Sequence, residues 1–447
     1  MRQRLLLWLY DLLYLLFLVV ASPYFIVRLV RDGALRRSLG GRFGRGPSRP
    51  GGEPAIWIHG VSVGEIKAAR SLVEGLRLRR PDLALAVSST TPAGLKLAES
   101  TLTEHFVFQF PLDLSFVVRR VLRRVRPSMI LLMELEIWPN LLQQARAAKI
   151  PVIVLNGRIS ARSFRGYRWI HGLLPELRKV DLFAVQNEEY AGRLRELGID
   201  ASRIAVTGNM KYDNLPTAGS PELIARVRAE IGLKEDEVVL LAGSTHPGEE
   251  EIALSVLAEL ESEFPGLRLV LVPRHVERGS EVVRCIERHG REPGVLTRLR
   301  TGTACSPRAI LLVDTIGELE AFYGIADVVF VGGSLVPIGG HNILEPAAMG
   351  RPVLFGPHMD NFRDEARVLL SKEGAVQVKD RAELLVQMRN ILRQRACAVR
   401  MGERAREAVA SVRGSTERNL QLVLSRLEER TAKESSSSDG KTHAVHL

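Results

Sequence analysis

The sequence predicts an α/β protein built from two doubly wound domains that face each other across a cleft, preceded by an apolar membrane helix. Short apolar runs alternate with amphipathic stretches, which is typical of parallel sheets covered by helices on both faces. The runs form two series, separated by residues 209–221, which are rich in Pro, Gly and Ser. A length of 447 residues also favours two cores over one.

The first element is the stretch Leu5–Val27, which is almost wholly apolar, contains Asp11 and is long enough to span a hydrocarbon core. Residues 1–50 hold nine Arg against two Asp, a large part of the net charge of +11. We interpret residues 1–50 as a retained membrane anchor and basic linker, with the globular domains on the cytoplasmic side. A helix lying in the membrane surface and a cleaved secretory signal are the alternatives. All three indicate a membrane, and none requires nucleic acid.

The first domain, residues 51–211, contains six apolar runs with the length and composition of buried strands. These runs are Ala55–His59, Leu83–Ser88, Phe106–Phe110, Met129–Met133, Val152–Leu155 and Leu182–Val185. Amphipathic stretches such as Glu65–Arg79 and Asp113–Arg124 predict the helices between them.

The second domain, residues 212–431, repeats the alternation. Its predicted strands are Val238–Ala242, Leu269–Val272, Ile310–Val313, Val328–Val331 and Val353–Phe355, with helices near 248–264, 277–289 and 361–371. Residues 432–447 include the run Ser435–Ser438 and predict a disordered tail. Doubly wound domains bind ligands at the carboxyl ends of their strands, so functional residues are expected there.

Three glutamates follow predicted strands at the spacing of a capping box. The pairs are Ser62 with Glu65, Thr315 with Glu318, and Asn342 with Glu345. Each glutamate could simply close a helix N-terminus, but their positions at strand ends also favour ligand binding. Glu65 is the one in the first domain, where a helix N-terminus would keep it ionised. It is our candidate general base for a single displacement that inverts configuration.

The segment MELEIWPN places Glu134 and Glu136 directly after a buried strand, where unpaired carboxylates are costly. By strand alternation the two carboxylates are expected to share a face, with Leu135 opposite. Lys211 and the basic segment 156–168 could supply the countercharge. The alternatives are a pair of solvated loop acids and a solvated basic surface.

Glycine-rich turns follow strands of the second domain and could hold a phosphate through backbone N–H groups. Ser244 and Thr245 lie in one turn, Gly333 lies in another, and Arg274 follows a third strand. Neither turn matches GxGxxG or the GxxxxGK[ST] loop, so nicotinamide cofactors and P-loop chemistry are not supported. The ten histidines form no metal-ligand motif, and the three cysteines form no CxxC pair. No cofactor or metal is expected.

Together these motifs resemble the Kdo (3-deoxy-D-manno-octulosonic acid) transferases of lipopolysaccharide synthesis. Between residues 59 and 358 the chain contains, in the order of that family, HGVSVGE, MELEIWPN, GNMKYD, AGSTHPGEE, VPRH, DTIGEL, YGIADVVFVGGSL and GGHNILEPAAMGRPVLFGPH. The first two motifs are the most specific. The glycine-rich blocks resemble glycosyltransferases of the two-domain B type (GT-B) in general, whose domains are Rossmann-like.

The resemblance implies an inverting transfer of Kdo from CMP-Kdo to a tetraacyl lipid A precursor (lipid IVA), with release of CMP and no cofactor. It implies that residues 51–211 bind the acceptor and residues 212–431 the donor, at the inner membrane and in contact with its phospholipids. Glu65 would be the proton acceptor, and Glu134 and Lys211 would stabilise the transition state. The implied CMP-binding residues are Pro273, Arg274, Ile316, Gly317, Glu318, Asn342, Ile343, Leu344 and Glu345.

Three other functions use the same fold class. A sugar-nucleotide epimerase would act on a soluble substrate and would not need Leu5–Val27. A transferase with a UDP-sugar donor would differ in the segment around Ile316–Leu319, which is expected to read the base. A nucleotide-sugar binding module without catalysis would have replaced Glu65, which is present. The number of Kdo residues added, the acyl-chain preference and the oligomeric state do not follow from these motifs.

Overall fold

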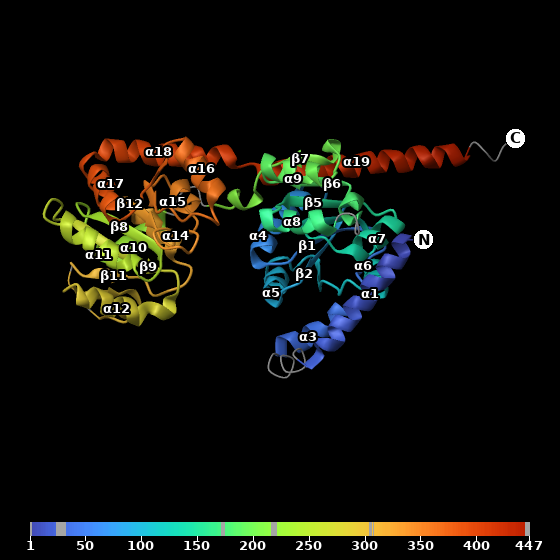
Figure 1. The fold of residues 1–447 in the computed structure, drawn as a ribbon, viewed down its shortest axis with the longest axis horizontal. Helices are drawn as coiled ribbons and strands as arrows, with labels where there is room; N and C mark the ends of the chain where they lie inside the picture. Colours follow the sequence, from blue (N-terminus) through green and yellow to red (C-terminus); the bar gives the residue numbers. More distant parts are fainter. Residues whose placement is uncertain are drawn as a thin grey trace. The chain divides into compact units, whose positions relative to one another are not determined.

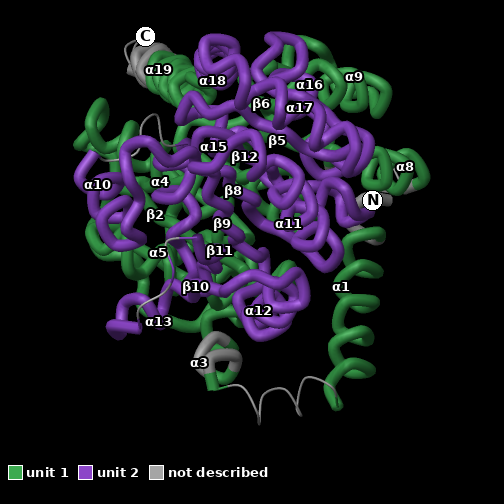
Figure 2. The backbone as a smooth tube through the Cα atoms, turned by 90° about the vertical axis from the view of Figure 1, so that its left-hand side faces the viewer, with its two compact units in different colours: residues 1–214, 413–447 green, residues 215–412 purple. Residues whose placement is uncertain are grey.

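The computed structural model describes residues 2–23, 33–170, 175–215, 221–303, 306 and 308–442. The chain divides into two compact units, which Figure 2 shows in different colours. Unit 1 comprises residues 1–214 and 413–447, and unit 2 comprises residues 215–412. The observed division follows Asn214, close to the predicted boundary between residues 211 and 212.

Unit 1 contains a seven-stranded sheet in the order β3-β2-β1-β4-β5-β6-β7, and every strand pair is parallel. Figure 1 labels β1, β2, β5, β6 and β7 of this sheet. Its strands are β1 Ala55–Gly60, β2 Ala84–Ser89, β3 Phe106–Gln109, β4 Pro127–Met133, β5 Val152–Gly157, β6 Leu182–Val185 and β7 Ile204–Val206. The six predicted strands are confirmed. The short edge strand β7 was missed, because it is only partly buried and so lacks the continuous apolar run of a central strand.

Helices cover both faces of this sheet. On one face α4 Val63–Arg79, α5 Pro92–Thr101 and α19 Ser415–Thr442 bury apolar side chains in a common cluster. The opposite cluster includes α6 Ser115–Val125, α7 Pro139–Ala147 and α9 Glu188–Glu196. Unit 1 also contains α1 Arg2–Val20, α3 Gly33–Arg42, α8 Ala161–Ile170, and the 3-10 helices η1 Pro175–Lys179, η2 Ala201–Arg203 and η3 Met210–Tyr212.

The C-terminal helix α19 corrects two predictions about residues 413–447. Residues 413–431 were assigned to the second domain, whereas Leu420, Val423 and Leu427 of α19 lie in the core of unit 1. Their spacing identifies an amphipathic helix but does not say which sheet it covers. A disordered tail was predicted from residue 432, and the structure instead continues the helix to Thr442.

Unit 2 contains a second parallel sheet of seven strands, in the order β10-β11-β9-β8-β12-β13-β14. Its strands are β8 Val238–Thr245, β9 Leu267–Pro273, β10 Pro293–Val295, β11 Ile310–Leu312, β12 Val328–Val331, β13 Val353–Phe355 and β14 Ala375–Gln377. The five predicted strands are confirmed. The three-residue edge strands β10 and β14 were missed, because such short runs carry little periodicity.

Nine α-helices accompany this sheet among the described residues of unit 2. They are α10 Pro221–Glu230, α11 Glu249–Leu260, α12 Gly279–Arg288, α13 Leu296–Arg300, α14 Leu319–Ile325, α15 Leu344–Ala348, α16 Arg363–Ser371, α17 Arg381–Arg393 and α18 Arg395–Val412; η4 Val276–Arg278 is a 3-10 helix. Helices α11, α12 and α17 bury apolar side chains against one face of the sheet. In both sheets the strand order runs outward in two directions from a central strand, β1 in unit 1 and β8 in unit 2, which is the doubly wound pattern that was predicted.

The N-terminal helix α1 is held against unit 1 by a polar contact. The Asp11 carboxylate accepts hydrogen bonds from the Asn140 side-chain amide at 2.7 Å and from the Ser115 backbone N–H at 3.2 Å. Among the described residues no helix combines the length and the hydropathy of a membrane span, which does not bear out the spanning prediction for Leu5–Val27. The segment contains Asp11, α1 ends at Val20, and residues 24–27 lie outside the described residues.

Candidate functional site

Three predicted catalytic residues lie at the carboxyl end of the unit 1 sheet. Glu65 stands in the first turn of α4, after β1, and Glu134 directly follows β4, the neighbour of β1. Lys211 belongs to η3, which follows the edge strand β7. The parallel arrangement thus brings together residues separated by up to 146 positions in the printed sequence.

The Glu65 carboxylate closes the N-terminus of α4. Its Oε2 accepts a hydrogen bond from the Val61 N–H at 2.9 Å, and its Oε1 accepts one from the Ser62 hydroxyl at 2.7 Å. Ser62 in turn accepts from the Glu65 N–H, completing the predicted capping box. Burial raises the pKa of Glu65 above its ordinary value, and the Glu134 charge adds to this, although the hydrogen bonds oppose both.

Glu134 forms an ion pair with Lys211, whose Nζ lies 2.7 Å from the Glu134 Oε1. The prediction that Lys211 supplies countercharge is therefore confirmed. The two carboxylates interact while Leu135 packs against the core, as predicted, but strand alternation is not the reason. The strand β4 ends at Met133, and Glu134 adopts a left-handed backbone conformation with φ of 58°.

Glu136 is a further member of the cluster, to which the sequence assigned no role. Burial, followed by the charges of Glu65 and Glu134, raises the pKa of Glu136 to about 7. Burial and the Glu136 charge also raise the pKa of the Tyr167 hydroxyl. The signal available in the sequence was its position two residues after Glu134. The basic residues Arg158 and Arg162 are exposed.

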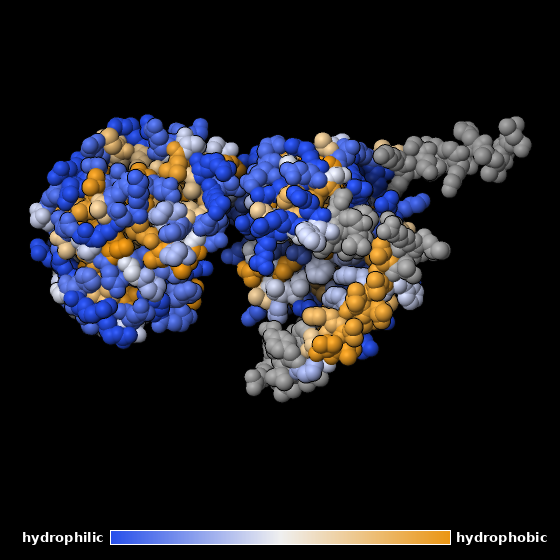
Figure 3. Space-filling model, in the orientation of Figure 1, coloured by the Kyte–Doolittle hydropathy of each residue, from blue (hydrophilic) through white to orange (hydrophobic). Residues whose placement is uncertain are grey.

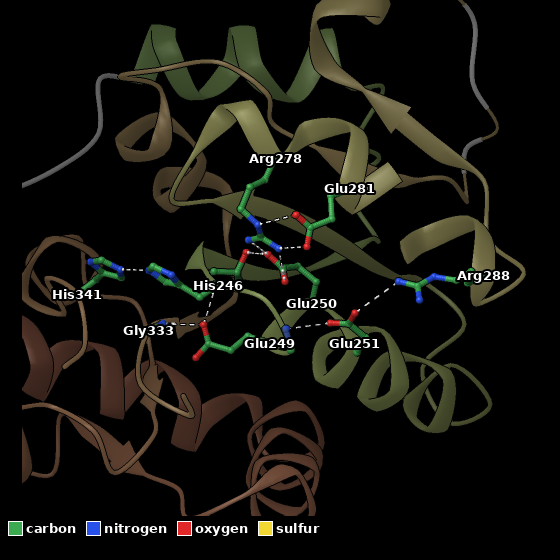
Figure 4. A network of polar contacts seen from close by, with 11 residues as sticks. His246, Glu249, Glu250, Glu251, Arg278, Glu281, Arg288, Gly333 and His341 are labelled. Carbon is green, nitrogen blue, oxygen red and sulfur yellow. Dashed lines mark hydrogen bonds and ion pairs between the residues drawn. The ribbon is translucent and has the colours of Figure 1, made fainter. Parts of the chain in front are cut away.

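In unit 2, the expected phosphate-binding turns are stabilised by buried carboxylates (Figure 4). The Glu249 side chain accepts hydrogen bonds from the backbone N–H groups of Gly333 at 2.7 Å and of Ser334 and Leu335 at 3.0 Å. Thr245 donates its hydroxyl to Glu250, which also binds Arg278. The Thr245 hydroxyl and the Gly333 N–H are therefore engaged within the protein, and Ser244 beside them is 7% exposed with φ of 56°.

Two histidines meet beside these turns. The Nε2 atoms of His246 and His341 lie 2.9 Å apart with nearly parallel rings (Figure 4). The His275 ring stands edge-on to His246. Burial, with the charge of Arg274 as the next cause, lowers the pKa of His341 to about 4. Arg274 itself is exposed, directly after the buried Pro273 at the end of β9. The strand end therefore presents the Arg274 guanidinium beside His341, whose imidazole is neutral at neutral pH.

The remaining predicted nucleotide-binding segments lie after β11 and before α15. Ile316 is 83% exposed, Gly317 has φ of 88°, and Glu318 pairs with Arg300 at 2.8 Å. The side-chain amide of Asn342 donates to the Glu345 carboxylate at 2.9 Å.

The capping boxes predicted at Thr315 and Asn342 are wrong. The helices α14 and α15 begin later, after Glu318 and Ile343, so neither predicted residue is the N-cap. Ile343 and Leu344 are buried and anchor the turn before α15.

The two sites differ in their chemistry. Unit 1 offers three carboxylates, two of them with raised pKa values, and one lysine, which suits proton transfer from a hydroxyl group. Unit 2 offers an arginine, imidazoles and glycine-rich turns at strand ends, which suits an anionic nucleotide. Within the described ranges no group of three or more His, Cys, Asp or Glu side chains could hold a metal ion.

Comparison with known proteins shows relatives along most of the chain. Residues 37–214 match the family described as 3-deoxy-D-manno-octulosonic-acid transferase (kdotransferase). A 3-deoxy-D-manno-octulosonic acid transferase of Haemophilus influenzae is 36% identical over 378 residues, which cover 83% of this chain and 87% of the relative. One from Chlamydophila psittaci is 32% identical over 375 residues, covering 83% of this chain and 85% of the relative.

The fold also occurs among solved structures. A glycosyltransferase from Rickettsia africae superposes with a TM-score of 0.57 at 12% identity, covering 83% of this chain and 98% of that one. This likeness shows the GT-B fold of two Rossmann-like sheets. The sequence relatives also show the family, because the sequence identity extends over most of this chain and most of each relative. The chain belongs to the Kdo transferase family of glycosyltransferases.

Proposed function

We propose that this chain transfers Kdo from CMP-Kdo to a tetraacyl lipid A precursor, lipid IVA, with inversion and release of CMP. The observation that carries the proposal is the cluster of Glu65, Glu134, Glu136 and Lys211 in unit 1 of a Kdo transferase family member. We place the reaction at the inner membrane, with both units on the cytoplasmic side. We assign the acceptor to unit 1 and the donor to unit 2.

Glu65 acts as the general base in this proposal. Its Oε2 accepts one hydrogen bond, from Val61, and a carboxylate oxygen can accept two. A lone pair therefore remains for the acceptor hydroxyl. The raised pKa of Glu65 brings the carboxylate nearer to the operating pH, which makes it a stronger base than an ordinary glutamate.

The pair formed by Lys211 and Glu134 places a positive charge beside the base. The Lys211 side chain is 43% exposed, so its ammonium group can also approach a negatively charged substrate. Charge develops on the donor phosphate as the bond to the sugar breaks, and a cation already in place stabilises that charge without reorganising. Glu134 holds the ammonium in position.

The donor is assigned to unit 2. Arg274, His246 and His341 are proposed to face the phosphate and carboxylate of CMP-Kdo, while the segments 316–318 and 342–345 hold the nucleoside, with Glu345 on the ribose. Ser244 is the residue of the first turn that we retain as a phosphate contact. The support is the exposed guanidinium of Arg274 and the exposed Ile316 at the strand ends.

Membrane attachment is assigned to α1. Figure 3 shows hydrophobic side chains gathered along this helix, and Trp8, Leu12 and Phe17 are 78%, 63% and 60% exposed. Arg119 and Arg123 of α6 line a hollow of unit 1, together with Arg45. An apolar helix face with arginines on the same unit suits an anionic phospholipid surface. Flotation with anionic vesicles tests this: Leu12→Asp/Phe17→Asp should abolish binding, and unchanged binding would refute it.

The test of the reaction is mass spectrometry of the products formed from CMP-Kdo and the tetraacyl precursor. Glu65→Gln keeps the capping geometry, because glutamine also completes a capping box, but it removes the base. We expect it to lower transfer about 100-fold or more while CMP binding is unchanged.

Ser62→Ala removes the N-cap and the hydroxyl that donates to Glu65 Oε1 but keeps the carboxylate, so it should retain most of the transfer activity that Glu65→Gln loses. Full transfer by Glu65→Gln would refute the assignment of the base. Absence of transfer by the unmodified chain, under conditions in which a relative is active, would refute the donor or the acceptor.

A further inference from the structure

A strongly basic hollow lies in unit 1 at the sheet edge opposite to Glu65. It has a volume of about 1310 Å³ and is formed around the amino ends of β4, β5 and β6, the C-terminal end of α7, and α19. Its charged lining residues are Arg146, Lys149, Arg178, Lys179, Asp181, Arg203, Arg426, Glu429 and Arg430. The catalytic candidates follow the carboxyl ends of the strands, whereas this hollow lies at the amino ends. The hollow is therefore separate from the site described above.

The positive charge of this basic hollow is not balanced by its own acids. Seven Lys or Arg side chains stand against Asp181 and Glu429. Asp181 accepts the Val152 backbone N–H at 2.8 Å, which does not cancel its charge, so the lining has an excess of five positive charges. Glu429 is engaged by Arg426 at 2.9 Å. Like charges gathered in a concave surface repel one another and attract an anion more strongly than the same charges on a flat surface.

Lys149 lines the hollow from a backbone position that favours glycine. The chain turns at the end of α7 with Ile150 N–H bonded to the Ala145 carbonyl at 2.8 Å, and Lys149 has φ of 56°. Glycine is the residue that fits such a helix end at the lowest cost. A lysine there contributes its side chain to the hollow in return for backbone strain.

The lining favours phosphate groups over other anions. Five of the seven cations are arginines, whose planar guanidinium groups bind phosphate through two hydrogen bonds. The lining contains no aromatic side chain on which a nucleobase could stack, which disfavours single-stranded nucleic acid. The surface is hollowed and not flat, which suits a compact ligand better than a protein face.

We infer that this basic hollow binds a ligand with clustered phosphate groups, at a site distinct from the transfer site. The phosphates could come from a soluble compound or from a phospholipid headgroup. The position of α1 favours the soluble source: Asp11 ties α1 to Asn140 in the first turn of α7, whereas the hollow lies at the other end of that helix. The inference is independent of the proposed reaction, because it concerns binding without donor or acceptor.

The experiment titrates the full chain with inorganic tripolyphosphate by calorimetry at low ionic strength. Arg146→Gln/Lys149→Gln removes two exposed charges from the basic hollow. Lys67→Gln/Lys96→Gln removes the same charge from exposed positions of α4 and α5 in the same unit. We expect the first variant to bind tripolyphosphate at least tenfold more weakly and the second to bind it like the unmodified chain.

Vesicles of phosphatidylglycerol in phosphatidylcholine identify the source of the phosphate. Vesicle binding that survives Arg146→Gln/Lys149→Gln supports a soluble ligand, and vesicle binding lost in that variant supports a headgroup. Three results would overturn the inference: no binding of tripolyphosphate to the unmodified chain, equal weakening by both double variants, or equal affinity for a polyglutamate peptide. The last would indicate an acidic protein partner.

Discussion

The ammonium of Lys211 and the carboxylate of Glu134 lie 2.7 Å apart, although 77 residues separate them in the sequence. The pair is partly exposed, with 43% and 24% of the two side chains accessible, so it contributes little to stability. Its main effect is electrostatic. Lys211 compensates one of three neighbouring carboxylates and so influences the protonation of the other two.

Replacing Lys211 by methionine should therefore impair activity and leave the fold intact. We expect kcat to fall roughly 100-fold, as for the loss of one preorganised cation, and the free energy of unfolding to change by less than about 1 kcal/mol. The uncompensated charge of Glu134 should further raise the pKa of Glu65, so the acid limb of the pH profile moves to higher pH. Lys211→Arg, which keeps the charge, should retain an unshifted limb. An unshifted limb in Lys211→Met would contradict this role.

The raised pKa of Glu136 leads us to expect that transfer depends on pH. Because its pKa is raised to about 7 and that of Glu65 is also raised, carboxylates of the cluster become protonated as the pH falls toward the acid range, and kcat/KM should fall with them.

The repulsion between Glu136 and Glu65 is mutual, so Glu136→Gln removes a like charge and should lower the pKa of Glu65. The acid limb should then move to lower pH, as measured by transfer rates between pH 5 and about 8, the range in which these groups titrate. Glu136→Asp is the control that keeps the charge. A limb at the same pH in Glu136→Gln would show that Glu65 does not sense Glu136.

We expect the hydrogen bonds that Asp11 accepts to hold α1 against the rest of unit 1. In Asp11→Ala the Ser115 N–H loses its acceptor, and the Asn140 side-chain amide keeps only the Asp113 carbonyl as a partner. We expect a loss of about 1–3 kcal/mol in the free energy of unfolding, together with faster hydrogen exchange in α1. Asp11→Asn keeps a carbonyl oxygen as acceptor and should behave nearly like the unmodified chain. Equal exchange in the two variants would show that these hydrogen bonds do not hold the helix.

A substitution of Leu420 tests whether the C-terminal helix α19 stabilises unit 1. It is 2% exposed and packs in the core of unit 1 with Leu72 and Leu76 of α4. Leu420→Ala should cost about 2–5 kcal/mol by creating a cavity, and hydrogen exchange should accelerate in β2 before β8. Ser425→Ala, at an exposed position of the same helix, is the control. Faster exchange in β8 alone would place the helix with unit 2.

Much of the fold follows from local pattern. The central strands of each sheet are continuous runs such as Ile56–Ile58 and Val328–Val331, which are apolar because both faces of a central parallel strand are buried. Edge strands such as β7 lack a continuous apolar run, since their side chains are less buried. The capping box of Glu65 was also readable, because its spacing is local. At Thr315 and Asn342 the same spacing was misleading, because it does not determine where a helix begins.

By itself, the sequence determined the parallel α/β class, the order of the central strands along the chain, the family, and the candidates Glu65, Glu134 and Lys211. These follow from periodicities and motifs that neighbouring residues carry. Only the tertiary structure decided that Lys211 pairs with Glu134, that Glu136 joins their electrostatic field, and that α19 returns to unit 1. Such contacts depend on how distant segments pack, and an amphipathic helix or a charged side chain does not encode which distant partner it meets.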